Sequence, residues 1–231
     1  MERIVITVDG LAGSGKSTLA KLLSEKLGYI HFNSGLIYRA IGYLALKNNT
    51  SASDANGVIS LLDKYKIVLN TTDSITIGDL ELSADELHLP EISEAASTVG
   101  SIPELRAKLV ELQREAYKGK NLVAEGRDMG TVIFPNAQCK FFVVASSEIR
   151  TARRLKQLGY EVGQHAEDIE EIAEKIKKEI LERDERDKNR AVAPTVAAED
   201  AVEIDNSSKT LTEIIQFMYD VVAKKGLITE K

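Results

Sequence analysis

A nine-residue stretch, residues 10–18, restricts the fold of this 231-residue sequence more than any other feature. It reads Gly-Leu-Ala-Gly-Ser-Gly-Lys-Ser-Thr, and its spacing matches the phosphate-binding loop, or P-loop, in full. The glycines let several backbone amides turn toward one point at the start of a helix, where the helix dipole favours an anion. In such a loop Lys16 reaches the β and γ phosphates of a nucleoside triphosphate, and the Ser17 hydroxyl can ligate Mg²⁺. The predicted phosphate-binding residues are Gly10, Leu11, Ala12, Gly13, Ser14, Gly15, Lys16, Ser17 and Thr18.

Strands and helices alternate around this loop. An apolar, β-branched run at 3–8 predicts a buried strand before it, and leucines at helical spacing predict a helix at 16–28 after it. A short strand at 29–32 and a helix at 35–49 follow. This alternation predicts an α/β fold. Further strands and a closing helix are expected at 121–125, 140–146, 201–205 and 210–225.

The segment from about 63 to 90 has a different pattern. Three short alternating runs, separated by Asn, Thr, Asp and Gly, predict a small antiparallel sheet inserted into the α/β core. Residues 91–118 are expected to be helical again, with Pro103 at a helix start. The long charged stretch at 146–190 also reads as helix.

The charge balance limits the function. A formal net charge of −6 and a pI near 5.3 argue against a nucleic-acid or anionic-membrane binder. An anionic ligand must therefore be captured by local groups of Arg and Lys. Cys139 is the single cysteine and excludes an internal disulfide, and no apolar run approaches the roughly 20 residues of a membrane span. We expect a cytoplasmic monomer with no nucleic-acid or membrane partner.

Arginines stand beside turns or small residues at three places that could form such a group. The first two places are 33–39 and 125–130, the second of them just past a strand's carboxyl end, where ligands of open α/β sheets collect. In the third, Arg183, Arg186 and Arg190 fall within about 60° on a helical wheel and could bind phosphate oxygens. The same segment can equally be a solvated helix face with i,i+3 and i,i+4 ion pairs.

A P-loop alone leaves several classes of nucleotide-binding protein open. A regulatory GTPase would usually carry an Asn/Thr-Lys-x-Asp motif, which the sequence lacks. A motor ATPase would end an apolar strand in an acid, and Asn-Leu-Val-Ala-Glu at 121–125 is an imperfect candidate. A small-molecule or nucleotide kinase suits the chain length best, because it needs only an acceptor pocket and a closing lid.

Four segments in this order resemble the bacterial cytidylate kinases: GLAGSGKST, NSGLIYR, EGRDMGTVIFP and ERDERDKNRAVAP. The resemblance spans nearly the whole chain and implies the fold of P-loop nucleoside monophosphate kinases. That fold has a five-stranded parallel sheet with helices on both faces, an acceptor-binding lobe with a small β insert, and a helical lid. By this resemblance the core is about 1–33, 119–152 and 195–231, the lobe about 34–118 and the lid about 153–194.

The resemblance also implies roles for individual residues. Arg127 would grip the acceptor phosphate, and Asp128 would accept a hydrogen bond from the cytosine amino group. Ser97 and Arg106 would read the remaining cytosine edge. The implied acceptor-binding residues are Ser34, Tyr38, Arg39, Ser97, Arg106, Arg127, Asp128, Arg183, Asp187 and Arg190. The residues expected to stabilise the transferring phosphoryl group are Lys16, Arg127, Arg183, Arg186 and Arg190.

The activity implied is transfer of the γ-phosphoryl group from ATP to CMP or dCMP, with Mg²⁺ held by Ser17 and Asp9 orienting its waters. Arg153 and Arg154 would either support the donor nucleotide or form a solvated helix face. Another acceptor remains open, namely UMP, AMP or an alcohol, although an alcohol would call for a general base instead of an arginine set. A nucleotide-binding regulator without catalytic activity is the alternative from a different class.

Overall fold

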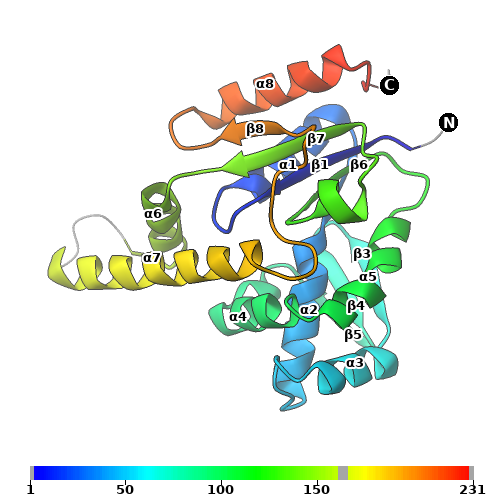
Figure 1. Ribbon diagram of the computed structural model, residues 1–231, viewed down its shortest axis with the longest axis vertical. Coiled ribbons are helices and arrows are strands. Elements are labelled where there is room, and N and C mark those ends of the chain that lie inside the picture. Colours follow the sequence, from blue (N-terminus) through cyan, green and yellow to red (C-terminus); the bar gives the residue numbers. More distant parts are fainter. Residues whose placement is uncertain (1–2, 161–165, 229–231) are drawn as a thin grey trace.

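A computed structural model describes residues 3–160 and 166–228. Its centre is a five-stranded, wholly parallel sheet with strand order β2-β6-β1-β7-β8 (Figure 1). The strands are β1 (Val5–Gly10), β2 (Ile30–Asn33), β6 (Leu122–Gly126), β7 (Cys139–Val144) and β8 (Val202–Asp205). Every residue of β1 is buried, as its largely apolar, β-branched sequence predicts for a strand covered on both faces. The predicted parallel sheet is confirmed.

Helices cover both faces of this sheet. On one face, α1 (Lys16–Leu27) and α8 (Leu211–Lys224) pack on a cluster that includes Ile6 and Phe141. On the other face, α2 (Ser34–Lys47) packs on a second cluster that includes Val5 and Phe32. Adjacent residues Val5 and Ile6 point to opposite faces because side chains alternate along a strand.

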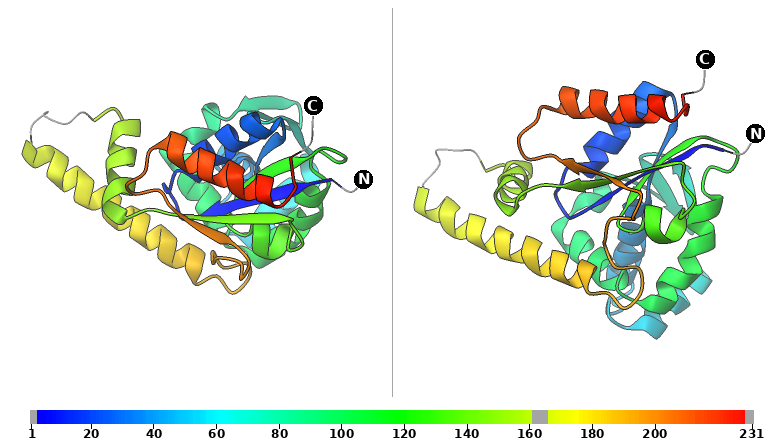
Figure 2. Two further views of the ribbon diagram at one scale, coloured as in Figure 1. Left: turned by 90° about the horizontal axis from the view of Figure 1, so that it is seen from above. Right: turned by 45° about the horizontal axis from the view of Figure 1, so that its top comes forward.

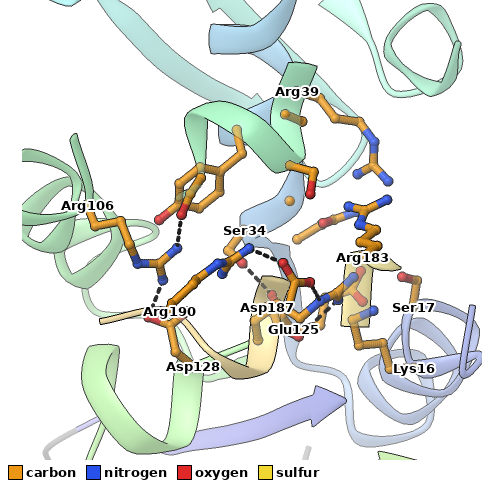
Figure 3. Close-up of a pocket in the computed structure, with 18 residues that line it drawn as sticks. Lys16, Ser17, Ser34, Arg39, Arg106, Glu125, Asp128, Arg183, Asp187 and Arg190 are labelled. Carbon is orange, nitrogen blue, oxygen red and sulfur yellow. Dashed lines mark hydrogen bonds and ion pairs between the residues drawn. The ribbon is translucent and has the colours of Figure 1, made fainter. Parts of the chain in front are cut away.

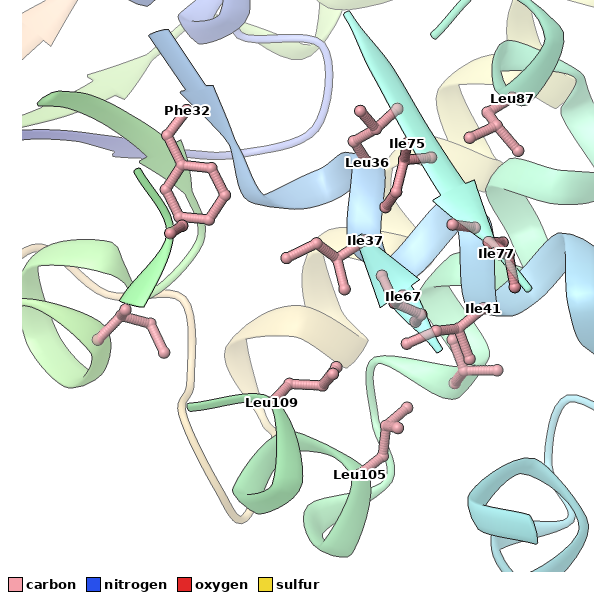
Figure 4. Packing of buried hydrophobic residues seen from close by; sticks show 14 of the residues in the cluster. Phe32, Leu36, Ile37, Ile41, Ile67, Ile75, Ile77, Leu87, Leu105 and Leu109 are labelled. Atoms are coloured by element: carbon pink, nitrogen blue, oxygen red, sulfur yellow. The ribbon is translucent and has the colours of Figure 1, made fainter. Parts of the chain in front are cut away.

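The second cluster continues into a lobe below the sheet. The lobe contains an antiparallel sheet of β3 (Ile67–Thr71), β4 (Ser74–Ile77) and β5 (Leu80–Ser83), so the predicted insert is confirmed. Figure 4 shows how Phe32, Leu36 and Ile37 near the main sheet lead to Ile75 of β4 and Leu109. The lobe therefore shares a core with the main sheet and is firmly attached to it.

The helices of the lobe differ in part from the prediction. The stretch 91–118 is two helices, α4 (Pro90–Val99) and α5 (Pro103–Glu115), and Pro103 begins the second as expected. A helix that the sequence pattern did not predict, α3 (Ala55–Lys64), starts where the Asp54 side chain accepts a hydrogen bond from the Gly57 amide. It buries only Val58 and Leu61, which is too short an apolar pattern to recognise.

Two helices at the side of the molecule, α6 (Ser147–Gln157) and α7 (Ala166–Lys188), pack on each other (Figure 2). Because α7 ends at Lys188, the expected helical arginine stripe is wrong at its last member: Arg190 lies beyond the helix. None of the described residues of α7 belongs to either apolar cluster. In the described part of the chain, no helix combines the length and apolar character that crossing a membrane requires.

Candidate active site

A pocket opens at the carboxyl ends of β1, β2 and β6, between the lobe and the end of α7 (Figure 3). Parallel strands bring their carboxyl ends to one edge, so the P-loop after β1 meets the turns after β2 and β6 there. All ten residues predicted to bind the acceptor line this pocket, together with Lys16 and Ser17 of the P-loop. The structure thus brings the predicted residues together, and their individual roles remain predictions.

The tight turn of the P-loop requires glycine at two positions, where a Cβ atom would clash with neighbouring atoms. A Cβ on Gly10 would lie 2.2 Å from the Val143 carbonyl oxygen in the neighbouring strand. Gly15 has a φ of +87°, and a Cβ there would lie 2.4 Å from the Asn206 side-chain nitrogen. At the start of α1, Lys16 Nζ donates a hydrogen bond to the Leu11 carbonyl oxygen at 3.3 Å. Burial, helped by the positive charge of Arg127, lowers the pKa of Lys16 to about 7.

Asp9, the residue before the P-loop, holds the turn that follows β6. Its carboxylate oxygens accept hydrogen bonds from the amides of Met129 and Gly130, at 2.8 and 2.7 Å. These amides begin a one-turn π-helix, Met129–Ile133, directly after Arg127 and Asp128. Asp9 therefore fixes the turn that carries the acceptor residues, and its proposed part in orienting metal-bound waters stays a prediction. Burial raises the pKa of Asp9 to about 7.

Glu125 is a site residue that the sequence analysis did not assign. It ends β6, lines the pocket beside Ser17 and is only 2% exposed. His31 Nε2 lies 3.1 Å from its Oε1. Burial alone would raise the pKa of Glu125, but the contact with His31 and the nearby Lys16 charge hold it below its ordinary value. The sequence feature that pointed to Glu125 is the acidic residue at the end of the apolar run 121–125, which was interpreted only as an imperfect motor-ATPase motif.

Four arginines surround the middle of the pocket, and one carboxylate joins two of them. Asp187 accepts hydrogen bonds from Arg127 Nε, at 3.0 Å, and from Arg190. Burial opposes ionisation of Asp187, but the positive charges of Arg127 and Arg190 keep its pKa below the ordinary value. Burial lowers the pKa values of Arg39 and Arg190 and takes that of Arg183 to about 10. Burial of the guanidinium groups, which disfavours their charged form, is the main cause of these three arginine shifts.

Two further arginines that could serve the phosphates make contacts within the protein. Arg186 points away from the pocket and forms an ion pair with Glu94 of α4 at 3.0 Å, and it is not among the pocket-lining residues. Arg153 donates to the carbonyl oxygens of Ser14 and Asn206, so it braces the P-loop from behind. Arg153 thus lies beside the P-loop, and a role in supporting the donor nucleotide stays a prediction.

The far end of the pocket holds a buried ion pair. Arg106 donates to Asp128 Oδ2 at 2.5 Å and to the Gly100 carbonyl oxygen at 3.0 Å, and its guanidinium lies 5.3 Å from the centre of the Tyr38 ring. Asp128 therefore pairs with Arg106, whereas its sequence neighbour Arg127 pairs with Asp187. The buried Ser97 hydroxyl has no hydrogen-bond partner among the described residues.

The pocket as a whole is positive. Six cationic side chains line it against three carboxylates, an excess of three charges that suits a phosphate-bearing ligand. The cations are Lys16, Arg39, Arg106, Arg127, Arg183 and Arg190. Buried guanidinium Nε atoms of Arg39, Arg183 and Arg190 have no partner within the described chain. A P-loop at one end and a second group of phosphate-binding cations beside it define a kinase whose acceptor is itself a phosphate compound.

The comparisons with known proteins give the particular family. The chain matches the cytidylate kinase family over residues 6–224 and belongs to that family. It is 40% identical to a cytidylate kinase of Caldicellulosiruptor bescii over 229 residues, which is 97% of each chain. It is 37% identical to a cytidylate kinase of Carboxydothermus hydrogenoformans, over 96% of this chain and 98% of the relative.

Solved structures share the fold at low sequence identity. A crystal structure of an uncharacterized protein from Eubacterium ventriosum matches with a TM-score of 0.52 and 11% identity, over 96% of this chain and 99% of that one. This likeness concerns the fold alone.

Proposed function

We propose that this protein transfers the γ-phosphoryl group of ATP to CMP or dCMP, giving ADP and the diphosphate. The observation that carries the proposal is the pocket itself. Within it, the P-loop residues Lys16 and Ser17 face a group of arginines, and a buried carboxylate–guanidinium pair lies beyond them. Membership of the cytidylate kinase family supports the same acceptor.

The acceptor phosphate would lie among Arg39, Arg127, Arg183 and Arg190. A phosphate dianion there would supply the negative charge that the buried guanidinium groups lack, through bidentate hydrogen bonds. Ser34, whose hydroxyl is already held by the Glu125 carbonyl oxygen at 2.8 Å, would seat the nucleotide at the start of α2. Asp187, held between two of the arginines, would fix their positions and reach the sugar.

The buried pair would recognise the base. Asp128 uses one oxygen, Oδ2, to hold Arg106, which leaves Oδ1 to accept a hydrogen bond from an amino group. Cytosine offers this amino group where uracil offers a carbonyl acceptor, and its neighbouring edge presents acceptors to Arg106 and Ser97. Two acceptors facing each other in a buried site cost roughly 1–3 kcal/mol, so the carboxylate would favour cytosine.

The reaction would depend on positioning and charge and would not need a general base, because the acceptor phosphate is already a nucleophilic oxyanion at neutral pH. Lys16 would bind the β and γ phosphates, and Arg127, Arg183 and Arg190 would stabilise charge on the transferring group. We propose that α6 and α7 form a lid, with the lobe and core divided as the resemblance implies. Closure of the lid would exclude water and so prevent hydrolysis of ATP.

Residues suited to Mg²⁺ are present beside the P-loop. Ser17 offers a hydroxyl and Glu125 an ionised carboxylate, both oxygen groups of the kind that this cation prefers. Within the described residues there is no cluster of three or more metal-ligating side chains, so most ligands would come from ATP and water. When bound, Mg²⁺ would neutralise charge on the β and γ oxygens.

The test is a coupled assay of ADP release with ATP and Mg²⁺, offering CMP, dCMP, UMP, AMP, GMP and shikimate separately. The proposal predicts rapid turnover with CMP and dCMP, slower turnover with UMP and negligible turnover with the others. Rapid turnover with AMP or shikimate and none with CMP would place the acceptor in another class. No ADP release with any acceptor would favour the regulator.

A further inference from the structure

One contact of α7 lies outside the acceptor site and has no part in the function just described. We propose that Asp184, acting with Arg150, is a positioning residue that fixes the P-loop when α7 lies against it, and so links the lid to the binding of ATP. This inference rests on the proposed function, because it assigns a role in donor binding to the same lid.

The two side chains hold both backbone polar groups of one P-loop residue, Ala12. Asp184 Oδ1 accepts a hydrogen bond from the Ala12 amide at 3.4 Å, and Arg150 donates to the Ala12 carbonyl oxygen at 3.1 Å. Asp184 Oδ2 and Arg150 Nη1 join each other at 2.5 Å. Arg150 is 4% exposed, so its charge depends on this carboxylate for a partner.

The position of α7 depends on contacts of this kind. Its described residues contribute to neither of the two main apolar clusters, although Ile176 is buried. Within the described residues, the hydrogen bond from α7 to the P-loop is made by Asp184. A change at Asp184 should therefore alter the P-loop without altering the hydrophobic core.

The same helix face also reaches the acceptor site. Asp187 follows Asp184 by three residues, which places both on one side of α7. Asp187 binds Arg127 and Arg190 in the acceptor site, whereas Asp184 binds the P-loop. One rigid helix thus joins the two substrate sites, with a separate carboxylate for each.

The experiment compares Asp184→Asn with Glu185→Gln. The first substitution removes the charge opposite Arg150 with little change in shape. Glu185 is the exposed neighbour on α7, and its contact is with Asn189, one helical turn away. Isothermal titration with the non-hydrolysable β,γ-imido analogue of ATP, and separately with CMP, gives each affinity without turnover, and thermal unfolding gives the Tm.

We expect Asp184→Asn to weaken binding of the ATP analogue by about tenfold and to leave CMP binding within twofold, while Glu185→Gln changes neither. Arg150→Lys, which keeps the charge but has a shorter side chain than is needed to reach the position of Nη1, should shift ATP binding in the same direction. Unchanged ATP affinity in Asp184→Asn would overturn the proposal. Equal losses for ATP and CMP with a lowered Tm would also overturn it, because they indicate a structural pair only. Since binding is measured without turnover, failure of the proposed reaction would be seen separately.

Discussion

Asp128→Asn tests base recognition with a minimal change in shape. Asp128 is 3% exposed and accepts a hydrogen bond from Arg106 through Oδ2. In the variant, the amide oxygen can still accept from Arg106, and the new NH₂ group takes the position of Oδ1. Arg106 also keeps its bond to the Gly100 carbonyl oxygen, so the guanidinium does not lose all its partners.

The structure allows the size of two effects to be estimated. Against Arg106, an ion pair becomes a hydrogen bond from a guanidinium to a neutral amide, and this loss of the countercharge should lower the free energy of unfolding by about 1–2 kcal/mol. Against CMP, the amino group loses an acceptor worth about 1.5–3 kcal/mol, so kcat/KM should fall roughly 10- to 150-fold. UMP, whose carbonyl now meets a donor, should gain, and the ratio of CMP to UMP turnover should fall by more than the loss for CMP alone.

The assay is the coupled release of ADP with CMP, dCMP and UMP, together with thermal unfolding. Asp63→Asn is the matched control, because Asp63 pairs with Lys108 on the exposed surface of the lobe. It removes the same charge and should leave every constant within twofold. An Asp128→Asn variant that folds and keeps the parental ratio of CMP to UMP turnover would refute the role of Asp128 in base recognition.

Four further predictions follow from charges in the site. The pKa of Lys16 is about 7 in the free protein, and the phosphates of ATP should raise it, so ATP binding at pH 8 should take up a proton. Calorimetric titration of ATP in buffers of different ionisation enthalpy measures this uptake. The uptake should vanish in Lys16→Arg, because arginine stays charged throughout. Without ligand, the same lowered pKa should make the free energy of unfolding rise with pH between about 7 and 10.5, the window in which the unfolded state binds more protons. Asp9→Asn should lower the free energy of unfolding at pH 8 by about 1–3 kcal/mol and weaken CMP binding, because the Asn side chain has one acceptor oxygen in place of the two that bind the backbone amides of the turn. An unchanged Tm would contradict this. Arg183→Gln should lower kcat about 100-fold or more. Arg186→Gln should keep kcat within threefold of the parent value, because Arg186 pairs with Glu94 at the surface. Equal losses of kcat in the two variants would show that Arg186 also acts in the active site.

Much of this architecture could be predicted from the sequence because the signals are local. The P-loop spacing, the apolar strands and Pro103 each specify an element within a few residues. The acceptor-binding set came from motifs that resemble a known family, and the pocket contains every member of it. Helix α3 was missed because its burial depends on packing within the lobe.

The sequence could not show which partners distant in the chain each charged residue contacts. Asp9 follows an apolar strand next to the P-loop, and only the structure shows that its carboxylate binds amides 120 and 121 residues away. Arg186 belongs to the same segment as Arg183 and Arg190, yet its side chain reaches α4. A charged side chain has several possible partners in the sequence, and the folded structure determines which of them lies within hydrogen-bonding distance.

The central claim is that the phosphoryl group passes from ATP to CMP within this pocket. The most direct measurement incubates the protein with ATP labelled at the γ phosphate, Mg²⁺ and CMP, and then separates the products by chromatography. The account predicts that the label appears in CDP, at a rate that falls when Lys16 or Arg183 is replaced. Label that stays in ATP, or appears only as inorganic phosphate, would contradict it.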